Sequence, residues 1–167
     1  MVSTADTMND YDNNMVEAFV NKPEVTQWYK NAFSRYSVNG VEKMSWVWSW
    51  WAFFGGIFYL LYRKAYMAAL GLFVLTIVSF AIPFGGLIVW ILTGGLAPYF
   101  VYKTYQSKKA EIEAAIDDEP KRIETMRVVG GYNDWAIWLA VALHVIMWIS
   151  VFFMFSAMMA MFSQQSF

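Results

Sequence analysis

Cysteine is absent from this 167-residue sequence, and histidine occurs only once, as His144. Without cysteine the chain has no disulfide, no thiolate nucleophile and no thiolate metal site. The formal net charge is only −1, so no strongly basic field is present to recruit nucleic acid. The sequence also lacks a nucleophile and base pair, a phosphate-cradling glycine loop and a metal-ligand spacing. We therefore expect a protein that is not an enzyme and that uses no cofactor and no metal.

Apolar residues are abundant: the hydrophobic fraction is 59%, and aromatic residues alone make up 20%. Soluble domains contain roughly 45–50% apolar residues. Several runs approach or exceed the roughly 18 residues that indicate a bilayer span. The sequence predicts an all-α integral membrane protein with three transmembrane helices and one Trp-rich short spanning or re-entrant segment. An N-terminal amphipathic helix and a cytoplasmic helical hairpin-like insert complete the predicted fold.

The N-terminal part of the chain is polar at first and then becomes amphipathic. Residues 1–13 have too little apolar surface to order themselves, which predicts a flexible tail. An amphipathic helix is predicted within residues 14–43, because aromatic residues recur at helical spacing. This stripe favours either a helix in the membrane interface with a docking face, or a helix that packs on the rest of the protein. The residues of the possible docking face are Trp28, Tyr29, Phe33 and Tyr36.

The membrane domain, residues 44–167, begins with a segment that contains four of the nine tryptophans. Residues 46–62 are at the lower limit of length for a span, and Gly55-Gly56 weakens a helix in the middle. Two interpretations remain open, a short spanning helix and a re-entrant or in-plane element. Tryptophan, tyrosine and basic residues collect where hydrocarbon meets headgroups. The predicted membrane-interface anchors are Trp46, Trp48, Trp50, Trp51, Tyr62, Arg63 and Lys64.

Three longer apolar segments follow, at residues 65–82, 84–102 and 135–162. The first two form a predicted transmembrane hairpin, because Pro83-Phe84-Gly85-Gly86 supplies a tight turn between them. Basic residues flank the hairpin but are absent from its turn, so the positive-inside rule places both ends in the cytoplasm. Residues 103–131 form a charged, cytoplasmic helix-break-helix segment. The last span then places the C-terminus in the periplasm.

Two features of the apolar segments are candidate contact sites. His144 lies within the last span, where an ionisable group is costly, and it is a possible intramembrane polar contact to another helix or a partner subunit. Small residues also recur at one-turn spacing, which lets membrane helices approach closely. These helix-packing pairs are Ala65 with Ala69, Ala136 with Ala140, and Ser156 with Ala160.

Four motifs stand out along the chain: Phe19-Val20-x-Lys22, Ser45-Trp46-x-Trp48-x-x-Trp51-Ala52-Phe53-Phe54-Gly55, Leu61-Tyr62-Arg63-Lys64-x-Tyr66 and Arg127-x-x-Gly130-Gly131. Together they resemble those of a bacterial family of small integral inner-membrane proteins of unknown function. The resemblance covers about Phe19 to Leu143, and in place of the Gly-Pro-x-Trp of such relatives this chain has Gly55-Gly56-Ile57-Phe58. It implies a bacterial cytoplasmic-membrane location and transfers no functional residue.

Three functions fit this sequence. The first hypothesis is a non-enzymatic accessory or scaffold subunit of a bacterial inner-membrane complex, which acts through helix packing and cytoplasmic docking. The alternative is a small homo-oligomeric transporter or channel component that uses His144. A third is a lipid-surface or envelope-stress protein, in which anionic-lipid binding depends on Lys103, Lys108 and Lys109. The expected partners are membrane lipids and another integral membrane protein, or further copies of the chain, and not nucleic acid.

Overall fold

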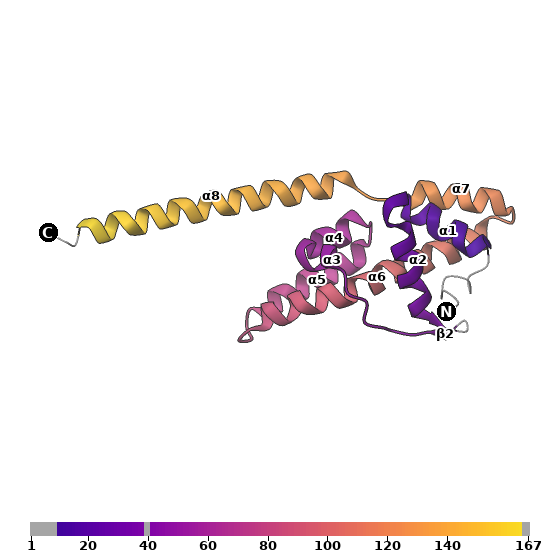
Figure 1. Cartoon of the computed structure of the whole chain (residues 1–167), viewed down its shortest axis with the longest axis horizontal. Coiled ribbons are helices and arrows are strands. Elements are labelled where there is room, and N and C mark those ends of the chain that lie inside the picture. Colours follow the sequence, from indigo (N-terminus) through magenta and orange to yellow (C-terminus); the bar gives the residue numbers. More distant parts are fainter. Residues whose placement is uncertain (1–9, 39–40, 165–167) are drawn as a thin grey trace. The chain divides into compact units, whose positions relative to one another are not determined.

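The computed structural model describes residues 10–38 and 41–164, and its internal contacts divide the chain into two compact units, residues 1–133 and residues 134–167 (Figure 1). Most described residues are helical. Two short strands in the first unit pair as an antiparallel hairpin, with Ser37 opposite Glu42 and Val38 opposite Val41. The elements of the first unit are α1 (Asp10–Val20), α2 (Pro23–Tyr36), β1 (Ser37–Val38), β2 (Val41–Glu42), α3 (Trp50–Gly55), α4 (Ile57–Tyr62), α5 (Tyr66–Ser79), α6 (Gly85–Ala115) and α7 (Glu119–Val129). The second unit contains α8 (Asp134–Gln164).

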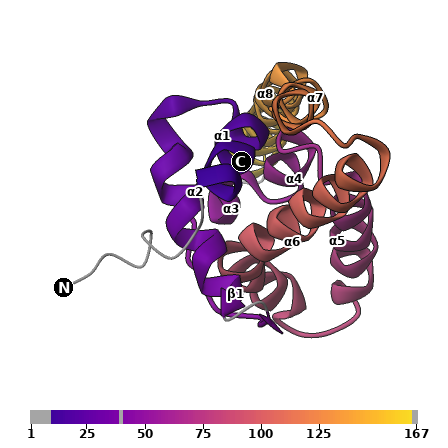
Figure 2. The same ribbon diagram turned by 90° about the vertical axis from the view of Figure 1, so that its right-hand side faces the viewer.

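Within the first unit α6 contacts α1, α2, α3, α5 and α7 (Figure 2). Phe53 of α3 stacks on Trp90 of α6, with ring centroids 4.5 Å apart. Further along α6, Phe33 of α2 lies 5.3 Å from the rings of both Tyr102 and Tyr105. The helix therefore joins an apolar half, next to α3 and α5, to a half that packs against α1, α2 and α7.

The N-terminal region is more ordered than its composition predicts. Residues 10–13 are helical rather than part of a flexible tail, because Tyr11 donates to Glu113 at 3.0 Å and Lys109 pairs with Asp12. Residues 1–9 of that predicted tail lie outside the described residues. The helical pattern predicted within residues 14–43 corresponds to two helices, α1 and α2, since the chain turns at Asn21 (φ 45°) and Pro23 begins α2.

The charged segment follows the predicted helix-break-helix pattern, with its first helix continuous with the preceding apolar one. Asp118 caps α7 by accepting from the Lys121 N–H at 3.3 Å, and Gly130 ends the helix. Because α6 has 31 residues and continues to Ala115, it contains nearly all of the predicted span 84–102 and also the first part of the charged segment 103–131.

Among the described residues, two helical stretches are long and apolar enough to cross a membrane. One lies within Gly85–Ala115, and the other lies within Glu119–Met159, a range that extends into α8. The sequence predicts three such spans. The missing one is α5, which has 14 residues and a length of about 21 Å at 1.5 Å per residue. Its side chains are nevertheless largely exposed, as are those at the start of α6. Most described side chains of α8 are exposed and apolar.

Candidate functional site

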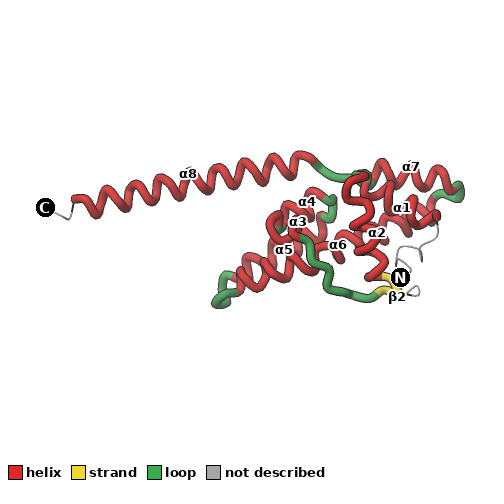
Figure 3. Tube along the Cα trace, viewed as in Figure 1, coloured by secondary structure: helices red, strands yellow, loops and turns green. Residues whose placement is uncertain are grey.

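The loop of residues 43–49, which precedes α3 and is green in Figure 3, hydrogen-bonds to the backbone of α6. Pro98 has no N–H, so the carbonyl of Gly94, four residues earlier, lacks its helical donor. The Ser49 N–H fills that place at 2.8 Å, and the Val47 N–H reaches the Gly95 carbonyl at 3.3 Å. Pro98 therefore leaves a free carbonyl on α6, and this carbonyl accepts a hydrogen bond from the tryptophan segment, residues 46–62.

Two glycines of α6 let the tryptophan rings approach its backbone. A Cβ on Gly94 would lie 2.8 Å from the Trp48 ring, and a Cβ on Gly95 would overlap the Trp46 ring. We call this set of Trp46, Trp48, Gly94 and Gly95 the Trp–Gly contact. The Trp–Gly contact holds the tryptophan segment against α6, and none of its four residues is charged.

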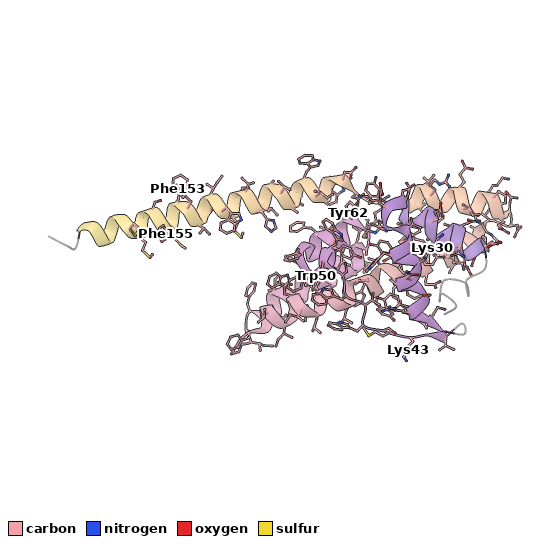
Figure 4. All side chains as sticks on the ribbon, in the orientation of Figure 1. Lys30, Lys43, Trp50, Tyr62, Phe153 and Phe155 are labelled. Carbon is pink, nitrogen blue, oxygen red and sulfur yellow. The ribbon has the colours of Figure 1, made fainter. Side chains whose placement is uncertain are left out.

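The predicted interface anchors divide between surface and interior. Trp50 and Trp51 are exposed to 62% and 79%, and Trp46 to 51%. Figure 4 labels Trp50 on α3 and Tyr62 at the end of α4. Trp48, Tyr62 and Lys64 are half-buried, whereas Arg63 is buried. The segment is also no continuous helix, because Gly56 (φ 52°) separates α3 from α4.

Arg63 is enclosed although the sequence predicts it at a membrane surface. Its side chain is 2% exposed, and its guanidinium lies 4.3 Å from the centre of the Tyr29 ring. The Nη1 group donates to the Val20 carbonyl at 3.4 Å, while Nε and Nη2 have no partner among the described residues. These two nitrogens form the side-on fork with which arginine holds two oxygens of one anion.

Three lysines belong to the same part of the fold. Lys22 donates to the Tyr62 hydroxyl at 3.2 Å, and its ammonium also lies 5.3 Å from the Tyr132 ring centre. Lys64 and Lys108 donate to the carbonyls of residues 130 and 129, at the C-terminal end of α7. Such contacts complement the negative end of the helix. We call Lys22, Arg63, Lys64 and Lys108 the basic junction.

Three chain segments meet at the backbone level beside this junction. The Gly131 N–H donates to the Phe19 carbonyl at 2.7 Å, and the Asn133 N–H donates to the Tyr62 carbonyl at 2.9 Å. Only glycine fits at residue 130, because a Cβ there would lie 2.8 Å from the Phe19 Cα, which is too close. The ends of α1, α4 and α7 are therefore fixed to one another.

The basic junction contains no ion pair in the part of the chain that the structure describes. The ion pairs found there join Lys30 to Glu17, Lys103 to Glu42, and Lys109 to Asp12 and Glu113. Burial lowers the pKa of Lys108, and the neighbouring charge of Lys64 lowers it further. The pKa of Lys22 is raised instead, chiefly because Lys22 donates to the Tyr62 hydroxyl.

The predicted docking face lies mostly inside the first unit. Tyr29, Phe33 and Tyr36 are buried, and only Trp28 is exposed, to 37%. Tyr29 and Tyr59 share a hydrogen bond of 2.9 Å between their hydroxyls. The amphipathic helix therefore packs against the rest of the protein, which is the second of the two arrangements that its pattern allows.

The predicted helix-packing residues and His144 differ in burial: Ala65 and Ala69 are buried in the first unit, whereas His144 is exposed. On α8, Ala136 and Ser156 are twenty residues apart, so at about 100° per residue they lie on nearly opposite faces. The side chain of Ala160 lies outside the described residues. His144 is exposed, and its Nδ1 lies 2.7 Å from the Ala140 carbonyl one turn earlier.

Glu42 attaches the β-hairpin to α6, because it accepts from the Tyr99 hydroxyl at 2.6 Å and from Lys103 at 2.8 Å. The hydrogen bond from Lys103 lowers the pKa of Glu42. This attachment therefore stabilises the fold above the unfolded pKa of about 4.3, and the stabilisation is lost as pH falls through the lower folded value.

We expect amide protection of residues 41–49 to decrease between about pH 5 and about pH 3, measured by hydrogen exchange. Lys103→Gln should weaken protection at neutral pH and reduce its pH dependence. An unchanged pH profile in Lys103→Gln would contradict this role of the pair.

Comparison with known families shows that residues 9–106, more than half of the chain, match the family described as proteins of unknown function, DUF2628. This agrees with the resemblance to an uncharacterised family. The matched region contains Lys22, Arg63, Lys64, Gly94 and Gly95. Neither the curated proteins nor the solved structures contain a match.

Proposed function

Because the chain belongs to the DUF2628 family, for which no function is described, we propose a role from its own surfaces: a non-enzymatic scaffold subunit of a protein complex in the bacterial cytoplasmic membrane. The observation that carries the proposal is the surface of α8. A helix that is hydrophobic on all sides is stable within a membrane or within a larger assembly. Exposed tryptophan, phenylalanine and methionine side chains occur along α8, including Trp138, Trp148, Phe152 and Met154.

The proposed topology places α1, α2 and α7 on the cytoplasmic side. α5 and the first half of α6 enter the membrane as a hairpin, and α8 crosses it. The two ends of the tryptophan segment support a re-entrant path. At one end the Lys43 N–H donates to the Tyr36 carbonyl at 2.8 Å, and at the other Arg63 donates to the Val20 carbonyl. Both ends thus contact the N-terminal helices.

A pair of reporter fusions tests this topology. A reporter that is active only in the cytoplasm should give signal when it is fused at Met1 and none when it is fused at Phe167. A periplasmic reporter should give the reverse result. A periplasmic N-terminus would contradict the re-entrant path, because the tryptophan segment would then cross the membrane.

Scaffolding requires that α8 contact a second membrane protein, and its small residues offer a place for close approach. We expect the tagged chain, extracted in a gentle detergent, to retain one membrane protein at a fixed ratio, as measured by native sizing and mass spectrometry. Ser156→Leu should release this partner, because the larger side chain separates the helices. Ala157→Leu, which adds similar bulk on the adjacent face, is the matched control.

Two results would contradict the scaffold proposal. Retention of the partner by both variants would show that this part of α8 is not the contact. A homo-oligomer without a second protein would favour the transporter hypothesis, in which His144→Ala abolishes flux while expression is unchanged.

A further inference from the structure

We propose that the basic junction binds the phosphate of an anionic membrane lipid. This proposal rests on the membrane location given above, and it adds a ligand site that the scaffold role does not require. The site consists of the ammonium groups of Lys22 and Lys64, with Arg63 and Lys108 beside them.

The first argument is uncompensated charge. Among the described residues, the direct contacts of the four cations are with neutral groups: the Tyr62 hydroxyl and aromatic rings for Lys22, a ring and a carbonyl for Arg63, and carbonyls for the other two. Glu24 and Glu111 act on Lys22 and Lys108 from a distance, without an ion pair. Two guanidinium nitrogens of Arg63 are buried without a partner among the described residues. Enclosed cations in proteins are normally paired with an anion. Arg63 is too enclosed to touch a ligand, whereas the half-buried side chains of Lys22 and Lys64 can reach one. An anion is therefore the expected ligand of these two lysines.

The second argument is the conformation of Lys64. Its backbone is left-handed (φ 58°), a conformation that is unfavourable for L-residues other than glycine. This conformation places the ammonium next to the end of α7, where it lies 4.0 Å from a Cβ built on Gly131. Lys22 reaches the neighbouring Tyr132 ring. Two ammonium groups from distant parts of the chain thus meet at consecutive residues, Gly131 and Tyr132.

The third argument is position along the membrane-entering helices. Tyr66 begins α5, and its hydroxyl accepts from the Asn133 side chain at 2.7 Å. Residue 133 directly precedes α8 in the chain. The junction therefore lies where two apolar helices start, which is the depth of the cytoplasmic headgroups in the proposed topology. Stacked rings of Tyr62 and Tyr132, 5.2 Å between centroids, border it and suit an interface location.

This position selects a lipid over a free phosphate ion. A lipid presents its phosphate at headgroup depth and extends its acyl chains along the exposed apolar side chains of α5. The lysines of the third sequence hypothesis fit less well. Lys103 is paired with Glu42, and Lys109 with Asp12. Lys108 is the one lysine of that set without an ion pair among the described residues.

The experiment uses the full chain purified in a neutral detergent and measures thermal unfolding. Short-chain phosphatidylglycerol should raise the melting temperature, whereas short-chain phosphatidylcholine and inorganic phosphate at the same concentrations should not. The variant Lys22→Gln/Lys64→Gln should bind phosphatidylglycerol about thirtyfold more weakly. The control Lys121→Gln/Arg127→Gln removes the same charge from exposed positions of α7 and should bind as the unmodified chain does.

Several outcomes would overturn the site. Equal stabilisation by inorganic phosphate would show a phosphate-ion site without lipid. Equal loss in both double variants would show a diffuse charge effect. Because Lys64→Gln also removes a contact to α7, Lys22→Gln alone serves as the second variant. If Lys22→Gln bound phosphatidylglycerol with the affinity of the unmodified chain, Lys22 would not be part of the site. Carbonate-washed membranes should retain every variant, since loss of the unmodified chain there would instead contradict the membrane location.

Discussion

Replacing both Gly94 and Gly95 by alanine is expected to detach the tryptophan segment from α6, although alanine is the better helix former. Alanine gains up to about 1 kcal/mol at each helical glycine. The new methyl groups would occupy space filled by the rings of Trp46 and Trp48, and they would break the backbone hydrogen bonds from Ser49 and Val47. Overpacking together with two lost hydrogen bonds gives a net destabilisation of about 2–4 kcal/mol.

Thermal unfolding in detergent, followed by tryptophan fluorescence, measures this effect. The matched control is Gly71→Ala on α5, where an added Cβ meets no described atom within 4 Å. That variant should be neutral or more stable by up to about 1 kcal/mol, since only helix propensity changes. If the double variant were as stable as Gly71→Ala, the tryptophan rings would not lie against α6 as described.

The Trp–Gly contact also shows what the sequence does and does not determine. Gly94-Gly95 and Pro98 are visible as interruptions of an apolar run, and the run was predicted as a transmembrane helix. The helix indeed forms. The local pattern does not identify the group that bonds to the free carbonyl of Gly94. The donor is the N–H of Ser49, a loop residue 45 positions earlier in the chain. The sequence feature that could predict this contact is the Gly-Gly-x-x-Pro motif at residues 94–98, in a chain that also contains the Trp-x-Trp motif at residues 46–48.

Local rules predicted the elements whose ends are set by neighbouring residues. Asp118, Pro120 and Gly130 delimit α7, and the long apolar segment predicts α8, which begins at Asp134. Helix faces were less predictable. An aromatic stripe on α2 is equally suited to a membrane interface and to a protein core, because both environments favour the same side chains. Tertiary packing on α6 decides between them.

Arg63 illustrates this limit best, and it leads to the second large effect. An Arg-Lys pair beside an aromatic segment is typical of a membrane interface, where truncation of an exposed side chain changes stability by only about 0.5 kcal/mol. The structure buries Arg63 against Tyr29 and the Val20 carbonyl. Arg63→Ala is therefore expected to destabilise the fold by about 2–4 kcal/mol, through a cavity and a lost hydrogen bond.

Arg63→Met separates packing from charge. Methionine fills similar space and removes a buried cation that has no carboxylate beside it among the described residues, so without lipid it should match or exceed the unmodified chain in melting temperature. Exposed Arg127→Ala is the control and should change stability by less than about 0.5 kcal/mol. Equal small effects of alanine and methionine would place Arg63 at the surface, where the sequence alone predicts it.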